Sequence, residues 1–337
     1  MAERFDKKQI RWWTTLVWAL AGLALLLLFN FFFTPGFFVV TVREGHLYGV
    51  LIDILNNGAK VMLLSLGMAL VIATRGVDLS VGAVMAIAGA VAARAINSGS
   101  VALAWVIIAA LGVAIIAGAW NGLLVGGFRI QPIVATLILM VAGRGVAMLI
   151  TDGQIITFTD PRLTFVGNGH WLGFPFPVWL SLGMLLITIA LTRSTALGLF
   201  IESAGDNQTA STYAGINAAT VKFFVYVFSG FCAGLAGLVA ASNIKCADSN
   251  HAGLFLELDA ILAVVVGGTS LNGGRFYLVG AVIGALFIQT LTTTMYMRNV
   301  SADIAPVPKA LAILAVCLLQ SPVVRRKASG LLKWRTA

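Results

Sequence analysis

Charged residues are scarce in this sequence. Of the 337 residues, 10% are Asp, Glu, Lys or Arg, whereas 59% are hydrophobic even without glycine. A soluble domain is usually about 25% charged, because polar side chains must cover its core. Too few charges are present here to build such a surface. The composition therefore excludes an ordinary soluble domain and predicts an all-α protein that lies in a lipid bilayer.

Residues that hold metals or perform catalysis are also few. The three cysteines and three histidines lie far apart and form no metal-ligand spacing. We therefore expect no metal site, no cofactor and no enzymatic activity. Residues 268–275 come closest to a phosphate-binding loop, but they lack the Lys-Ser/Thr pair that such a loop needs. Any ATP hydrolysis is expected in a separate partner subunit.

The basic residues do not form a nucleic-acid surface. The net charge is +9, and basic residues gather near the two ends, in residues 4–11 and 325–335. Basic clusters beside apolar spans are typical of the cytoplasmic side of membrane proteins. No basic stripe alternates with stacking aromatic residues. We therefore expect membrane lipid, and no nucleic acid, around this chain.

Long apolar segments fill most of the sequence. About 20 apolar residues are needed to cross a bilayer as a helix. Ten segments qualify, at about 12–33, 51–74, 79–98, 101–127, 132–150, 177–192, 218–241, 257–270, 277–297 and 306–321. The first resembles a signal peptide, but it is too long for one, so we expect a retained span.

Ten spans would put both termini on one side of the membrane. The basic ends indicate that this side is the cytoplasm, and most of the 22 basic residues then fall on it. Two connections are too long to be turns: residues 151–176 outside and residues 193–217 inside. Long ordered loops are often functional, so both are candidate docking surfaces.

The inner loop contains the signals of two short helices. Residues 195–204 are compatible with a helix that Gly205 breaks, and Asp206 or Asn207 is placed to cap a second helix, residues 208–214. Gly215 is placed to end it. A helix of about two turns is marginal in water and must dock against something. The partner is either its own bundle or a groove in a separate subunit.

Four stretches resemble a known transporter family. They are TRGVDLSVGA (residues 74–83), QPIVATLILMVAGRG (131–145), LDAILAVVVGGTSLNGGRF (258–276) and the inner loop at residues 192–217. Together they resemble permeases of ribose-type sugar ATP-binding-cassette (ABC) importers, and most closely the galactofuranose-importing branch. Arg75 stands where the family usually has glycine, which leaves the packing of that turn open.

This resemblance implies a role and a set of partners. It implies one transmembrane permease domain over residues 1–337, in the bacterial inner membrane, that carries a monosaccharide such as galactofuranose. A cytoplasmic ABC ATPase, a periplasmic sugar-binding protein and a second permease chain, identical or related, would complete the importer. The loop 193–217 would be the coupling loop. The residues expected at the ATPase interface are Glu202, Gly205, Asp206, Asn207 and Ala210.

Polar residues within the spans are candidates for the translocation path. Lys60 and Arg144 are the charges predicted deep in spans, where an unpaired charge costs several kcal/mol. Each either faces water or clamps neighbouring helices, and for Arg144 the clamp is the favoured interpretation. The candidate path residues are Asn56, Asn57, Asn121, Thr136, Arg144 and Gln289.

All 13 acidic residues are predicted in loops or near span ends. Ion-coupled carriers usually place carboxylates deep in the membrane. The alternative function, an ion-coupled secondary sugar transporter or a channel acting without an ATPase, is therefore less favoured.

Small residues four apart, as in Gly118 and Gly122, Gly230 and Gly234, and Gly280 and Gly284, predict close helix packing.

Overall fold

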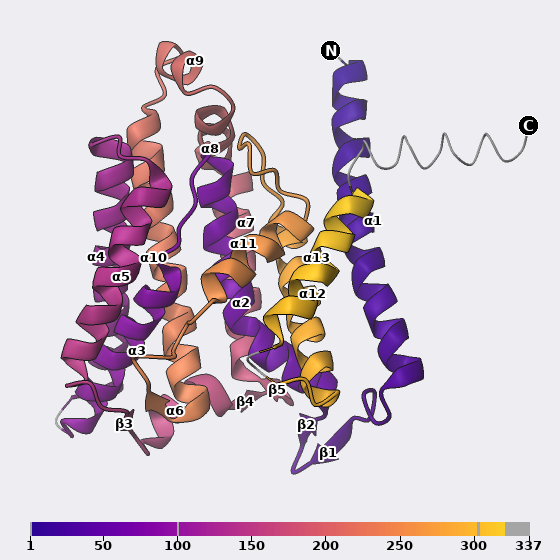
Figure 1. The fold of residues 1–337 in the computed structure, drawn as a ribbon. Coiled ribbons are helices and arrows are strands. Elements are labelled where there is room, and N and C mark those ends of the chain that lie inside the picture. The colour runs from indigo at the N-terminus through magenta and orange to yellow at the C-terminus, as the bar shows by residue number, and fades with distance from the viewer. Residues whose placement is uncertain (1, 100, 302–303, 321–337) are drawn as a thin grey trace, which may run out of the picture.

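The structure, a computed structural model, describes residues 2–99, 101–301 and 304–320, and most of these lie in helices (Figure 1). The helices are α1 (Ala2–Phe33), α2 (Val50–Ala73), α3 (Val81–Asn97), α4 (Leu103–Gly122), α5 (Pro132–Ile150), α6 (Pro161–Asn168), α7 (Phe176–Arg193), α8 (Leu197–Asp206), α9 (Gln208–Tyr213), α10 (Ala218–Ile244), α11 (Leu256–Val266), α12 (Leu278–Met297) and α13 (Pro306–Gln320). A π-helical turn, η1 (Leu123–Gly127), extends α4. The basic cluster at residues 325–335 lies outside the described residues.

Seven helices of the described chain are long and apolar enough to cross a membrane: α1, α2, α4 with η1, α5, α7, α10 and α12. The expected all-α, multi-span fold is confirmed. The segments expected at 79–98, 257–270 and 306–321 contain the shorter helices α3, α11 and α13. With 17 and 11 residues, α3 and α11 are each too short to cross about 30 Å of hydrocarbon alone.

Three two-stranded antiparallel pieces interrupt the helical pattern. They pair β1 (Thr41–Arg43) with β2 (His46–Tyr48), β3 (Ile156–Thr157) with β6 (Cys246–Ala247), and β4 (His170–Trp171) with β5 (Phe174–Pro175). All lie at the end of the bundle opposite α8 and α9 (Figure 1). The loop expected at 151–176 contains β3, α6, β4 and β5. Hydrogen bonds between these strands pair backbone N–H and C=O groups that are not part of a helix.

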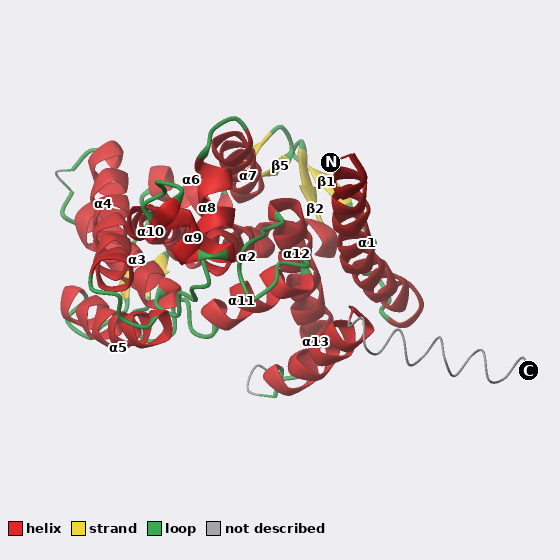
Figure 2. Cartoon of the chain, turned by 90° about the horizontal axis from the view of Figure 1, so that it is seen from above, coloured by secondary structure: helices red, strands yellow, loops and turns green. Residues whose placement is uncertain are grey.

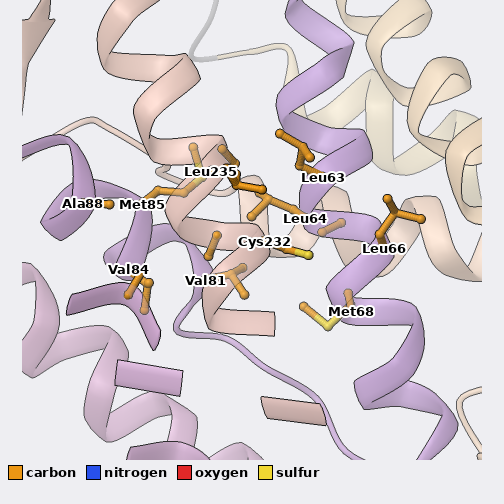
Figure 3. Close-up of a cluster of buried hydrophobic side chains, with 14 of the residues drawn as sticks. Leu63, Leu64, Leu66, Met68, Val81, Val84, Met85, Ala88, Cys232 and Leu235 are labelled. Atoms are coloured by element: carbon orange, nitrogen blue, oxygen red, sulfur yellow. The ribbon is translucent and has the colours of Figure 1, made fainter. Parts of the chain in front are cut away.

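The core is built around α2 and α10. Most of the side chains of α2 from Gly58 to Ala73 are buried. Leu63, Leu64, Leu66 and Met68 of α2 pack with residues of α3 and α10 in one cluster (Figure 3). In the view along the bundle, α1 lies at the edge (Figure 2). Large apolar side chains of α1, α4 and α5 are exposed. This pattern fits a protein whose outer surface contacts lipid.

Small residues let the buried helices approach closely. A Cβ atom at Gly230 of α10 would lie 2.5 Å from the carbonyl oxygen of Ala114 in α4. A Cβ atom at Gly284 of α12 would lie 2.0 Å from the carbonyl oxygen of Ala263 in α11. The predicted packing seams are therefore confirmed as contacts of α4 with α10 and of α11 with α12.

Two segments without regular helix run into the bundle from opposite ends. Residues 74–80 lead inward from the α8–α9 end to the start of α3, and residues 248–255 lead inward from the other end to the start of α11 (Figure 1). They meet where a Cβ atom at Gly82 would lie 2.4 Å from the carbonyl oxygen of Gly253. Interrupted helices that meet inside the membrane are a common feature of transporter folds.

Candidate functional site

The α8–α9 pair projects from one end of the bundle (Figure 1). Asn207 ends α8 and caps α9, because its side-chain oxygen accepts a hydrogen bond from the Ala210 amide at 3.0 Å. Gly215 follows α9 with a φ of +83°, a conformation that favours glycine. The prediction of a short capped helix is confirmed, with Asn207 rather than Asp206 as the cap.

Gly205 has a different role from the one expected. The prediction that it breaks the first helix is wrong, because α8 continues through it to Asp206. Its missing side chain instead allows close packing: a Cβ atom there would lie 1.8 Å from the carbonyl oxygen of Ala73, at the end of α2. The glycine is needed so that α8 can dock on the core.

Arg75 holds this docked arrangement together. Its Nη2 donates a hydrogen bond to the carbonyl oxygen of Asp206 at 2.6 Å, and its Nε donates to that of Asn272 at 2.8 Å. The amide of Gly274 donates to the carbonyl oxygen of Ala73 at 2.9 Å. We call these contacts the Arg75 clamp. The clamp joins the end of α8 to both the α2–α3 segment and the loop that follows α11.

α9 has few contacts with the bundle: its first residue, Gln208, accepts a hydrogen bond from the Lys222 ammonium of α10 at 3.0 Å. Ser211 is buried, and its hydroxyl lies 2.7 Å from that of Ser203 in α8. Tyr213 on the opposite side is 88% exposed. Of the five predicted interface residues, Asp206, Asn207 and Ala210 are exposed, Glu202 is half-buried and Gly205 is buried. The pair thus presents a small surface on a firmly docked base.

Two of the predicted path residues belong to a buried network around residues 74–80. Asp78 is 1% exposed and accepts hydrogen bonds from the Ser80 hydroxyl at 2.6 Å and from the Ser229 hydroxyl at 2.8 Å. Asn121 donates to the Ser80 hydroxyl at 2.8 Å. Thr136 is buried, and its hydroxyl lies 3.4 Å from the carbonyl oxygen of Val77 as well as 2.9 Å from that of Pro132 in its own helix. Both candidates hold the interrupted segment in place.

Two acidic residues lie at a loop and a helix end, as predicted, but are more deeply buried than those positions suggest. Asp78, in the non-helical stretch 74–80, is enclosed by α4 and α10 and bound by their side chains. Glu257 is 8% exposed, and one of its oxygens would lie 2.5 Å from a Cβ atom at Gly82. Each carboxylate lies beside the N-terminus of α3, where the helix dipole favours negative charge. Sequence polarity alone does not reveal that a loop enters the bundle.

Three other candidates lie along α2 and α12. Asn57 is exposed and accepts a hydrogen bond from the Lys60 ammonium at 3.3 Å. Asn56 has a buried side-chain oxygen for which the described residues provide no hydrogen-bond donor. Gln289 of α12 donates to the Thr293 hydroxyl at 3.3 Å, and its side chain packs against Gly58. None of the hydrogen bonds of these three residues within the described chain joins them to the Asp78 network.

Arg144 fastens the second interrupted segment to α5. Its Nη1 donates hydrogen bonds to the carbonyl oxygens of Ser249 at 3.0 Å and Ala252 at 2.6 Å. The favoured interpretation as a clamp agrees with these contacts. The six path candidates therefore separate into three groups rather than one continuous line. Arg75 was not among the candidates, although its replacement of a family glycine was the signal that could have selected it.

The comparisons with known proteins give the family. A family model described as "Branched-chain amino acid transport system / permease component" matches residues 50–319. The chain belongs to this permease family. No solved structure matches it. As a permease component with several apolar helices, this family member is a multi-pass protein of the bacterial inner membrane, and such subunits are not themselves enzymes.

Curated relatives of this permease resemble it over most of their length. It is 50% identical to the galactofuranose transporter permease protein YtfT of Escherichia coli K12, over 94% of this chain and 92% of that one. It is 37% identical to the fructose import permease protein FruF of Bifidobacterium longum, over 96% and 92%. It is 39% identical to the ribose import permease protein RbsC of E. coli K12, over 80% and 85%. The predicted resemblance to sugar importer permeases is confirmed.

Proposed function

We propose that this permease is the membrane-spanning subunit of an ABC importer for a monosaccharide, galactofuranose or a similar sugar. Its relatives with sugar names cover nearly the whole chain. A subunit of this kind needs a cytoplasmic surface on which an ATPase docks and transmits its conformational change. The α8–α9 pair has the properties of such a surface. It is short, exposed at its tip and tied by the Arg75 clamp to residues 74–80 and to the loop at residues 272–274.

The observation that carries this proposal is the Arg75 clamp. A displacement of α8 acts directly on Asp206, and the clamp passes it to residues 74–80 on one side and 272–274 on the other. The first segment leads to α3 and the second joins α11 to α12. ATPase closure on the coupling loop 193–217 would thus reach both helices whose N-termini meet inside the bundle. Coupling elements act through such two-state packed contacts.

The decisive experiment places a bulky charge on the tip of α9. Ala210→Arg is expected to abolish most co-purification with the cytoplasmic ABC ATPase, because the added side chain would occupy the docking groove. The purified permease alone is expected to hydrolyse no ATP. Pull-down of the ATPase by the tagged permease, with ATPase activity measured on the eluate, checks both expectations.

The matched control is Ala102→Arg, which adds the same side chain to an exposed alanine at the opposite end, before α4. This variant should recover as much ATPase as the unaltered chain. Equal recovery with Ala210→Arg would remove α9 from the interface. Sugar accumulated in vesicles by the permease without any ATPase would favour the ion-coupled alternative instead.

The remaining features of the proposal concern topology and assembly. We infer about ten passes with both termini in the cytoplasm, which puts α8–α9 inside and residues 151–176 in the periplasm. This orientation follows the basic clusters and the common end of the bundle that holds α9 and the start of α1 (Figure 1). A periplasmic sugar-binding protein would dock on the outer loops, and a second permease chain, identical or related, would complete the pore.

A further inference from the structure

A crevice of about 350 Å³ lies where α1, α7 and α12 come together, near the α8–α9 end of the bundle. Its lining includes Leu16 of α1, Ile189 and Arg193 of α7, and the first three residues of α12. Leu16 begins the apolar span of α1, Arg193 ends that of α7, and Leu278 begins that of α12. The crevice therefore lies at the level where a bilayer changes from hydrocarbon to headgroups.

The lining of the crevice is mostly apolar. α1 and α7 both lie beside α12 and provide its walls (Figure 2). Its floor is tightly packed, because a Cβ atom at Gly267, directly after α11, would lie 2.4 Å from the carbonyl oxygen of Gly280. Val279 is 44% exposed, so the crevice is not filled by the described chain. Its volume is within the range of pockets that hold small ligands.

Arg193 gives this crevice a positive rim. It is the only charged residue among the described residues that line it. Its side chain is exposed, and its guanidinium has no hydrogen-bond acceptor in the described part of the chain. The first turn of α12 lines the same space without a side-chain cap, so the positive end of its dipole adds to the charge of Arg193. An apolar crevice with a cationic rim fits an amphiphile whose polar end is negative.

The position of the crevice indicates which amphiphile that is. It opens at the boundary of the bilayer, where phospholipids surround the protein. Residues 4–11 of α1 contain four basic residues and one acidic residue and precede Leu16 in the same helix. A basic segment directly outside a span attracts anionic lipid. The five basic residues of the C-terminal segment 325–335 would instead be repelled by Arg193.

We propose that the crevice binds one anionic phospholipid, with its phosphate on Arg193 and an acyl chain along Ile189 and Val279. Guanidinium groups bind phosphate through two parallel hydrogen bonds, a geometry that zwitterionic headgroups also meet but with less net attraction. The proposal rests on the proposed function only for the orientation of the chain. Lipid binding itself requires neither sugar nor ATP.

This lipid would contact both segments that lead to the Arg75 clamp. Arg193 begins the coupling loop 193–217, which continues through α8 to Asp206. Residues 276–280 follow the loop 272–274, whose Asn272 is bound by Arg75. An anionic lipid is therefore placed to stabilise the inner end of the permease at the point where the ATPase acts.

The test is lipid retention by the full-length permease. The protein is extracted from vesicles of equal parts phosphatidylglycerol and phosphatidylethanolamine and weighed intact by native mass spectrometry. The unaltered chain should retain phosphatidylglycerol in preference. Arg193→Gln should lower that retention about fivefold, the effect of one basic residue near anionic lipid. Arg129→Gln removes another exposed basic residue at the same end, outside the crevice, and should retain as much as the unaltered chain.

A second pair of variants tests the apolar part of the crevice without changing its charge. Val279→Trp should fill the space beside Arg193 and lower the retention of phosphatidylglycerol several-fold. Val141→Trp places the same side chain on the exposed face of α5, where Val141 is 70% exposed, and is the matched control. It should leave retention unchanged.

Three results would overturn the proposal. Equal retention by Arg193→Gln and Arg129→Gln would show that Arg193 holds no phosphate. Unchanged retention by Val279→Trp would place the lipid outside the crevice. The same spectra count permease chains, and if Val279→Trp converted paired chains into single ones, the occupant would be a second permease chain. Because neither transport nor ATPase binding is measured, failure of the proposed function would leave these results unaffected.

Discussion

Arg75 combines an unusual backbone with a demanding side chain. Its φ of +61° lies in the left-handed region, which costs a residue other than glycine roughly 1–2 kcal/mol. Its guanidinium meets two carbonyl oxygens at once, a geometry that the fork of arginine provides and lysine does not. Glycine at this position would suit the backbone but would remove both hydrogen bonds. In this chain, the unfavourable backbone conformation of Arg75 is offset by hydrogen bonds that link α8 to residues 74–80 and to residues 272–274.

Arg75→Gly is therefore expected to weaken the coupling of ATP hydrolysis to transport while leaving the stability of the fold nearly unchanged. Two charge-assisted hydrogen bonds are lost, but the guanidinium is exposed and the backbone strain is relieved. The free energy of unfolding should therefore change by no more than about 1 kcal/mol. Sugar transported per ATP hydrolysed should fall several-fold, because motion of α8 no longer reaches residues 74–80. Thermal unfolding in detergent and the transport-to-hydrolysis ratio in proteoliposomes measure the two effects.

Arg129 offers a matched control for that variant. It also has a positive φ, +57°, and is exposed in the loop between η1 and α5. Arg129→Gly removes the same side chain from the same backbone conformation without touching α8. Its transport-to-hydrolysis ratio should equal that of the unaltered chain. A ratio that falls equally in both variants would show that positive charge at this end, and not the clamp, matters.

At the scale of elements, the docking of α8 depends on the absence of one methyl group. Gly205→Ala would place a carbon 1.8 Å from the carbonyl oxygen of Ala73, so α8 must shift. Overpacking of this kind costs about 1–3 kcal/mol, and transport should be lost with it. Gly183 in α7 has open space around its missing Cβ, so Gly183→Ala should stabilise the helix by up to about 1 kcal/mol. Thermal unfolding of the two variants should therefore move in opposite directions.

The same scale shows what hydropathy predicts and what it misses. Seven long helices coincide with predicted spans because burial in lipid demands an apolar run, which is visible in the sequence. Gly205 was mistaken for a helix breaker because its neighbour, Ala73, is 132 positions away in the chain. Asp78 looks like an ordinary loop residue because the polarity of a sequence does not reveal burial. Only its hydrogen bonds with Asn121 of α4 and Ser229 of α10 show that its segment enters the bundle.

The whole molecule has two chemically different ends. One carries α8, α9 and the Arg75 clamp, and the other carries the short strands and α6 (Figure 1). The two interrupted segments enter from these opposite ends and touch at Gly82 and Gly253, where neither glycine has room for a Cβ atom. Because this contact is tight, a displacement of the segment at the α8–α9 end would displace the segment from the other end. Packed interfaces switch between discrete states rather than deform gradually. This arrangement fits a subunit that receives its driving motion on one side and its solute on the other.

The orientation of these ends can be tested in right-side-out vesicles. Tyr213→Cys at the tip of α9 and Val42→Cys in β1 both place a thiol at a strongly exposed position. With Cys246→Ser and Cys317→Ser as background, a membrane-impermeant thiol reagent added outside should label Val42→Cys and should reach Tyr213→Cys only after the vesicles are opened. The reverse pattern would put α9 in the periplasm. No cytoplasmic ATPase could then act on it, and the part played by the Arg75 clamp in coupling would have to be abandoned even though its hydrogen bonds remain.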